Sequence, residues 1–207
     1  MASTASPYGL KPVNEIGGLP YAGSTRTFLI DPAGYATNIF NGSLVYVNSS
    51  GYLNLVTADG SDGTTNAFPA GTTLTGAVGV FVGCSYYNAQ GQLIFSQYYP
   101  SGTTGVVKAM VVDDPNVVFQ CQANGSVAQA KLGENVTLAN AQSTSTGSTT
   151  TGNSNVAVSA TSKTTTAPFR IVGFVDMQGF STVGDSYTDI LVKWNPGWHT
   201  YTNVLGL

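Results

Sequence analysis

The chain has 207 residues, of which 42% are hydrophobic and only 8% are charged, and its formal net charge at pH 7 is -3. Average soluble domains carry roughly 25% charged residues, so the solvent-facing surface must consist mainly of Ser, Thr, Asn, Gln and Gly. The few Lys and Arg residues form no cluster, which argues against a nucleic-acid-binding surface.

A surface with so little charge offers little repulsion between copies, and we expect a homo-oligomer, a dimer or a trimer. No run of residues approaches the ~18 apolar residues of a membrane span, so no membrane partner is expected. The first residues lack the basic and apolar regions of a secretory signal, which predicts synthesis in the cytoplasm. The length suits one domain, with an extended arm over 1–25 and a β-rich domain over 26–207.

The arm is defined by prolines and glycines that alternate with large apolar side chains. Closely spaced prolines exclude a helix, so the chain must be extended here. Apolar side chains on an extended segment can dock along a neighbouring molecule or pack on their own domain, and both alternatives remain open. The residues predicted to make contacts with a partner are Pro7, Tyr8, Leu10 and Pro12.

Short strands separated by turn residues follow the arm. A strand is predicted over 26–30 and ends at the turn sequence Asp31-Pro32-Ala33-Gly34. Two hairpins are predicted next, one joining 44–47 to 52–56 and one joining 78–87 to 92–99. Asn and Gly occupy both connections, as tight turns require.

The central stretch, 106–122, contains two apolar runs that meet at Asp113-Asp114-Pro115-Asn116. Pro115 disfavours helix at Asp114, and Asp and Asn side chains hydrogen-bond turn backbone. After the turn, apolar residues alternate with glutamines, which is typical of a half-buried strand. We expect this stretch to form the central hairpin of the fold.

The remaining chain is also β-like, with a weaker strand pair over 127–139 and strands over 169–175 and 187–194. The Ser/Thr/Gly-rich segment 142–166 is predicted to be a solvent-exposed loop or an edge hairpin. The tail forms an aromatic cluster in which Trp198 and Tyr201 are candidate contact residues. The predicted fold is an all-β, jelly-roll-like single domain, either a β-barrel or a β-sandwich.

No catalytic, metal or cofactor site is predicted. The single histidine, His199, lies in the aromatic tail, and no GxSxG motif presents a serine. Cys84 and Cys121 fall on apolar strand faces and are interpreted as core residues. The sequence Asp59-Gly60-Ser61-Asp62-Gly63 lacks the alternating acids of a calcium loop. The paired aspartates 113 and 114 are explained by turn formation.

Several phrases along the chain resemble capsid decoration, or cement, proteins of tailed bacteriophages, especially those of marine and cyanobacterial podoviruses. They are SPYGLKPVN at 6–14, PYAGSTR at 20–26, GYATNIFNG at 34–42, GVFVGCSY at 79–86, VVDDPN at 111–116 and HTYTN at 199–203. The resemblance implies a virion protein on the outer capsid surface that clamps subunits of an HK97-fold major capsid protein. It implies no catalytic residue. The alternative is a virion-surface module that binds a receptor or glycan through exposed aromatic residues.

Overall fold

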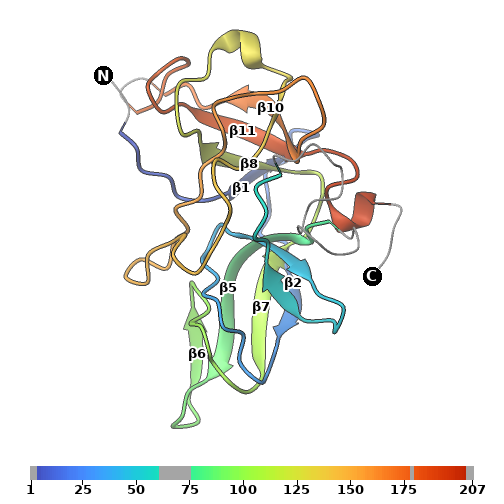
Figure 1. The fold of residues 1–207 in the computed structure, drawn as a ribbon, viewed down its shortest axis with the longest axis vertical. Helices are drawn as coiled ribbons and strands as arrows, with labels where there is room; N and C mark the ends of the chain where they lie inside the picture. The colour runs from blue at the N-terminus through green and yellow to red at the C-terminus, as the bar shows by residue number, and fades with distance from the viewer. Residues whose placement is uncertain (1–3, 61–75, 178–179, 204–207) are drawn as a thin grey trace.

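The computed structural model describes residues 4–60, 76–177 and 180–203 and contains two antiparallel β-sheets (Figure 1). Helix is confined to two short 3-10 turns in the described chain, η1 (Gln129–Lys131) and η2 (Thr200–Thr202). The all-β prediction is therefore confirmed. Neither sheet closes into a barrel within the described residues, and the arrangement is consistent with a β-sandwich.

Sheet A has the strand order β1-β8-β11-β10-β9. Its central strand β11 pairs with β8 on one side and with β10 on the other. Ile190, Val192 and Trp194 share one face of β11 and are all buried. The bounds are β1 (Lys11–Glu15), β8 (Val117–Gln122), β9 (Asn135–Val136), β10 (Phe169–Phe174) and β11 (Asp189–Trp194).

Sheet B has the order β2-β7-β5-β3-β4, and β6 also pairs with β5. The predicted hairpins β3–β4 and β5–β6 are confirmed. In each, an asparagine carboxamide oxygen, of Asn48 or Asn88, accepts two backbone N–H groups of the turn. The bounds are β2 (Arg26–Ile30), β3 (Leu44–Val47), β4 (Leu53–Leu55), β5 (Gly79–Tyr87), β6 (Leu93–Ser96) and β7 (Val107–Val112).

The prediction of a central hairpin over 106–122 is wrong in its pairing. Both strands and the turn form, but β7 pairs with β2 and β5, whereas β8 pairs with β1 and β11. The turn at 113–116 therefore carries the chain from sheet B to sheet A. Each strand already has a neighbour on both edges, which leaves no edge for the two to pair with each other.

Two apolar cores meet at this crossing. One core is built on sheet A and also takes Val80 and Val112 from sheet B. The other core lies within sheet B and includes Phe81, which follows Val80 on β5, and Val111, which precedes Val112 on β7. Since successive strand residues point to opposite faces, β5 and β7 contribute to both cores. These two strands thus connect the halves of the molecule.

The N-terminal arm is part of sheet A. Its strand β1 is the edge strand beside β8, and Leu10 just before it is fully buried in the larger core. The carboxamide of Gln122 accepts from the backbone N–H of Ser6 and donates to the carbonyl of Thr4. Leu10 therefore packs on its own domain, which is one of the two alternatives predicted for the arm.

The Ser/Thr-rich segment 142–166 is not simply a solvent-exposed loop. Val158 is buried, and the buried Gln142 carboxamide bonds the backbone of Leu44 and Val56. Gly147 lies against the ring of Phe40, where a Cβ atom would overlap it. The segment therefore covers core residues, using polar side chains to satisfy buried backbone groups.

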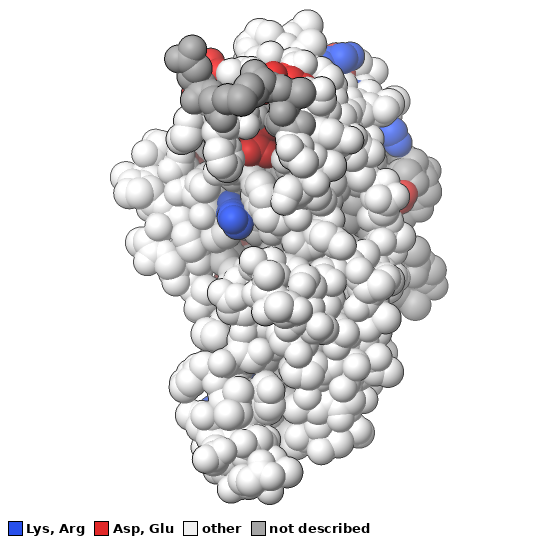
Figure 2. Space-filling view, turned by 90° about the vertical axis from the view of Figure 1, so that its left-hand side faces the viewer, with Lys and Arg blue, Asp and Glu red and all other residues white. Residues whose placement is uncertain are grey.

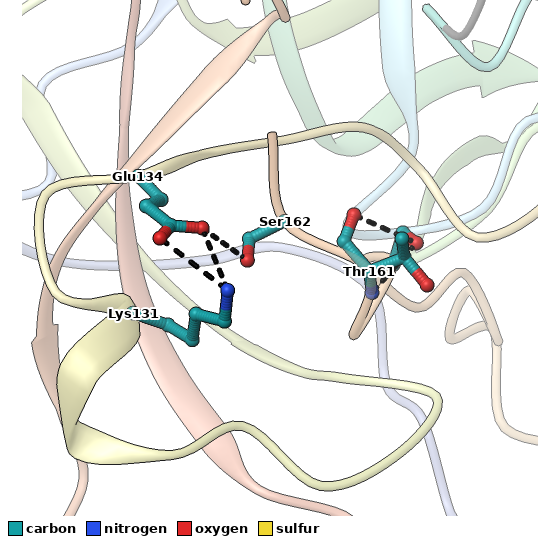
Figure 3. A network of polar contacts seen from close by, with 5 residues as sticks. Lys131, Glu134, Thr161 and Ser162 are labelled. Carbon is teal, nitrogen blue, oxygen red and sulfur yellow. Dashed lines mark hydrogen bonds and ion pairs between the residues drawn. The ribbon is translucent and has the colours of Figure 1, made fainter. Parts of the chain in front are cut away.

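The predicted strand pair over 127–139 is only partly correct, because Gln129–Lys131 forms η1 and only Asn135–Val136 is a strand. Beside η1, a polar network fastens the Ser/Thr-rich segment (Figure 3). Glu134 forms an ion pair with Lys131 at 3.2 Å and accepts a 2.6 Å hydrogen bond from the Ser162 hydroxyl. These bonds, that of Ser162 first, lower the pKa of Glu134.

Candidate functional site

The turn between β7 and β8 has the geometry that its sequence predicts. The carboxylate of Asp114 accepts the backbone N–H of Asn116 at 2.8 Å, and its carbonyl accepts that of Val117 at 3.3 Å. Asp114 is therefore a turn residue. On the other side of this turn, the carbonyl of Asn116 accepts the backbone N–H of Ile16 at 3.0 Å, so the arm lies directly beside it.

The C-terminal tail reaches the same turn through Asp113. One carboxylate oxygen of Asp113 accepts the Tyr201 hydroxyl at 2.9 Å and forms an ion pair with Nε of Arg26 at 2.9 Å. Arg26 also donates to the Tyr201 hydroxyl at 2.9 Å. Asp113 thus joins β2, through its ion pair with Arg26, to the C-terminal tail, through its hydrogen bond with Tyr201.

His199 is fully buried behind this cluster and packs edge-on against the rings of Trp194 and Tyr201. Its Nδ1 accepts the backbone N–H of Tyr201 and so caps η2. Burial lowers its pKa to about 4, although the nearby Asp113 opposes the shift. A neutral, buried imidazole that is already engaged as a cap serves packing better than catalysis.

The other candidate nucleophiles and acids are dispersed. Cys84 and Cys121 are buried and unpaired, as predicted, and burial raises the pKa of Cys84 to about 12 and that of Cys121 still further. Within the described ranges, no three His, Cys, Asp or Glu residues lie together as metal ligands would. The segment 59–63, which was predicted not to bind calcium, lies mostly within 61–75, outside the described residues.

Among the described residues, Asp189 on β11 is a buried carboxylate, and it lies next to Tyr8 and Lys11 of the arm. Burial raises its pKa, and the Tyr8 hydroxyl and Lys11 oppose that rise. The Tyr8 hydroxyl accepts from the carboxamide of Gln120, and Lys11 lies 4.3 Å from the centre of the Tyr8 ring. Asp189 therefore helps to hold the arm. Among the described residues, no second carboxylate contributes to its pKa, as the partner in a catalytic carboxylate pair would.

The predicted contact residues have different positions. Pro7, Tyr8 and Pro12 are half-buried along sheet A, whereas Leu10 is fully buried in the protein's own core. Trp198 is also fully buried, and Tyr201 is half exposed. Leu10 and Trp198 are thus corrected to core residues: each reaches the larger core from an extended segment, a position that residue type alone does not reveal.

The apolar residues that do face outward on the arm are Ile16 and Leu19, which are 50% and 64% exposed. They flank Gly17 and Gly18, where the N–H of Gly18 bonds the carbonyl of Glu15 in a tight turn. In the sequence, the Gly-Gly pair between two large apolar residues indicates a tight turn that exposes both of them. We call Ile16, Leu19, Asn116, Arg26 and Tyr201 the junction surface. Ile16, Arg26 and Tyr201 bond residues of the turn between the sheets, Asn116 belongs to that turn, and the carbonyl of Leu19 accepts from the N–H of Glu15, the residue before Ile16.

Charge is distributed unevenly around this surface. On the face drawn in Figure 2, coloured side chains gather in the upper half, which holds sheet A, and the lower half is almost entirely uncoloured. The sequence agrees, because residues 63–107 contain no Asp, Glu, Lys or Arg. The described helices include none that is long and apolar enough to cross a membrane.

Comparison of the chain with protein-family models found no match. Comparisons with curated proteins and with solved structures likewise found no significant match.

Proposed function

We propose that this protein is a structural virion protein that decorates the outer surface of an icosahedral phage capsid. In this role it stabilises the shell by clamping neighbouring subunits of an HK97-fold major capsid protein. The observation that carries the proposal is the junction surface, where exposed apolar residues from the arm and the half-exposed Tyr201 from the tail lie near the turn at 113–116.

The composition of the junction surface supports a protein partner. Ile16 and Leu19 supply apolar area, and Arg26 and Tyr201 supply hydrogen-bonding groups beside it. Tyr and Arg are enriched in protein interfaces, where apolar centres are bordered by polar groups. Their mutual polar contacts hold Arg26, Asp113 and Tyr201 in place, so little side-chain freedom would be lost on binding.

The energetics of decoration suit such a surface. A typical interface buries about 800 Å² per partner, and a Kd of ~1 μM corresponds to about -8 kcal/mol. A decoration protein repeats this contact over a whole shell, so moderate binding by each copy offsets a large internal pressure. A fold stabilised by two apolar cores and free of disulfides suits assembly from the cytoplasm.

The test uses shells of the HK97-fold major capsid protein from the phage that encodes this chain. Purified protein is mixed with undecorated shells, and cosedimentation and the melting temperature of the particle are measured. We expect the wild type to cosediment and to raise the melting temperature. Ile16→Asp and Leu19→Asp should each reduce binding at least tenfold, because each places a charge in the apolar contact.

The matched control is Val106→Asp, which changes an exposed valine on the sheet B half, away from the junction surface. It should bind shells as the wild type does. Absence of wild-type cosedimentation would contradict the capsid role, and equal binding by the Ile16 and Leu19 variants would contradict the junction surface as the contact.

A second function, binding of a glycan on a host or virion surface, is favoured by one pocket. A hollow of about 270 Å³ lies between the arm and the Ser/Thr-rich segment, lined by Tyr8, Ser148, Thr151, Asn153 and Asn155 among others. Hydroxyl and amide groups beside an aromatic ring are the groups that bind sugars. Glycan-array binding that is lost in Asn153→Ala would favour this function over decoration.

A further inference from the structure

Strand β6 has an unused edge. It pairs with β5 through Cys84–Ser96, Ser85–Phe95, Tyr86–Ile94 and Tyr87–Leu93, and no other described strand lies against it. The turn begins with a hydrogen bond from the N–H of Asn88 to the carbonyl of Gln92. Because hydrogen-bonded pairs alternate along an antiparallel ladder, the backbone groups of Ile94 and Ser96 point to β5 and those of Leu93 and Phe95 point outward.

The side chains on this edge are apolar and exposed. Phe95 is 75% exposed, Leu93 is 48% exposed, and Tyr87 across the strand pair is 62% exposed. Phe95 and Leu93 are two residues apart and therefore share one face of the strand. Edge strands of monomeric proteins are usually protected by charges, prolines or bulges, and β6 (LIFS) has none of these.

The absence of charge favours a second copy of the chain as the partner. Since residues 63–107 carry no charged side chain, two copies that meet at β6 bring no like charges together. An antiparallel strand pair is also self-complementary, as a two-fold interface requires. In Figure 1 the β5–β6 hairpin projects at the lower end of the molecule, where a second copy has access.

We propose that two copies of the chain associate through antiparallel pairing of β6 with β6, on a two-fold axis at Ile94. In this register Leu93 of each copy forms a hydrogen-bonded pair with Phe95 of the other, which uses all four outward backbone groups on each copy. Leu93 and Phe95 then form cross-strand apolar contacts, a pairing that stabilises sheets. Sheet B becomes continuous across the dimer.

The area available makes this a weak dimer in solution. Phe95, Tyr87 and Leu93 together expose on the order of 400 Å² per copy, which is about half of the roughly 800 Å² per partner that a typical stable interface buries. A Kd of about 100 μM is expected for the isolated chain. The inference goes beyond the proposed capsid role and stands without it, because it concerns the isolated chain alone.

The register is tested by cross-linking through Ile94→Cys. At a two-fold, non-hydrogen-bonded pair the two Cα atoms lie about 4.5 Å apart, within the range of a disulfide. Under mild oxidation this variant should form a covalent dimer through the two introduced thiols, identified by mass spectrometry of the linked peptides. The control Ser50→Cys, at the exposed β3–β4 turn, should remain a monomer, and the native cysteines are buried.

The association itself is tested by analytical ultracentrifugation of the full chain. Wild type should dimerise with increasing concentration, and Phe95→Lys should weaken dimerisation at least tenfold without lowering the melting temperature. Leu93→Pro, which removes one outward N–H group, should have the same effect. A wild type that stays monomeric at about ten times the expected Kd, or equal cross-linking of the Ile94 and Ser50 variants, would overturn the proposal.

Discussion

The sheet A half and the sheet B half of the molecule differ in how their polar and apolar side chains are used. Sheet A is covered: the arm lies along it, Gln120 and Gln122 hydrogen-bond the arm, and Asp189 and Lys11 lie beneath or beside Tyr8. In sheet B, no described strand pairs with the outer edge of β6, and Phe95 and Leu93 are exposed there. The sheet A half thus uses its polar side chains internally and exposes apolar residues only on the arm, at Ile16 and Leu19, whereas the sheet B half exposes apolar residues along its β6 edge.

This difference separates residues that specify the fold from residues that are free to bind. In sheet A the polar groups are engaged, so changing them should alter stability. In the outer edge of sheet B the apolar groups make few internal contacts, so changing them should alter association. The following variants test the residues that stabilise the fold, beginning with the largest expected effect.

Gly79→Ala should produce the largest loss of stability. A Cβ atom at Gly79 would overlap the carbonyl of Val112, and the strands β5 and β7 that meet here belong to both cores. We expect the free energy of unfolding to fall by about 4 kcal/mol or more, because backbone cannot move aside as a flexible side chain can. Urea denaturation measures the loss. Gly17→Ala, with open space around it, should cost much less.

His199 should make stability depend on pH at the junction of the two halves. Its pKa is lowered from 6.5 to about 4 by burial, so between these values the unfolded chain takes up a proton that the folded chain does not. Stability should therefore fall as pH falls through this window, by about 3 kcal/mol for this group between pH 7 and pH 4.

The measurement is urea denaturation of wild type and His199→Gln at several pH values. The carboxylates titrate in both proteins, so the difference between the two isolates the histidine. The stability of wild type relative to the variant should decline from pH 7 to pH 4. A difference that is constant over this range would contradict the burial argument.

Gln122→Ala should loosen the arm without unfolding the domain. The carboxamide makes one bond to Ser6 and one to Thr4, and the variant leaves those backbone groups without their partner. A loss of about 1–2 kcal/mol is expected. Hydrogen exchange should show faster exchange at Ser6, and Gln97→Ala should leave that exchange rate unchanged. Slow exchange at Ser6 in Gln122→Ala would show that the carboxamide is not needed.

Glu134→Gln should have the smallest effect. Its pKa is lowered by the Ser162 hydroxyl and Lys131, so the stabilisation is present above the usual value of 4.5 and is lost as pH falls below it. The variant should be slightly less stable than wild type at pH 7, and the two should converge at low pH. Because the carboxylate is partly exposed to solvent, the difference should also shrink in high salt.

Local features of the fold were predictable from the sequence, and pairing was not. The turns at Asn48 and Asn88 are specified by side chains that bond their own backbone, so short-range chemistry predicts both hairpins. The alternation in β8 likewise predicts that Val117, Phe119 and Cys121 face the core. The prediction of a half-buried strand is wrong, however, because Val118 and Gln122 on its other face are buried as well. Alternation does not specify a neighbour, and β7 and β8, adjacent in sequence, were therefore wrongly expected to pair.

The candidate site was partly predictable for a related reason. The arm and the tail were expected to carry contacts, and Tyr201 does reach the surface. Leu10 and Trp198 are buried, because an extended segment can turn any apolar residue toward its own core. The burial of Leu10 also means that deletion of residues 1–20 would remove core and an edge strand, so point variants at Ile16 and Leu19 are the better test.

The most direct test of the capsid role is a density map of shells decorated with this protein. The account predicts one copy or one β6-paired dimer per binding site on the outer surface, with Ile16, Leu19 and Tyr201 against the major capsid protein. Where a β6-paired dimer is bound, Phe95 should lie against the second copy of the chain, away from the shell. A decorated shell in which Ile16 and Leu19 face solvent, or a shell that carries no copy of the chain, would contradict it.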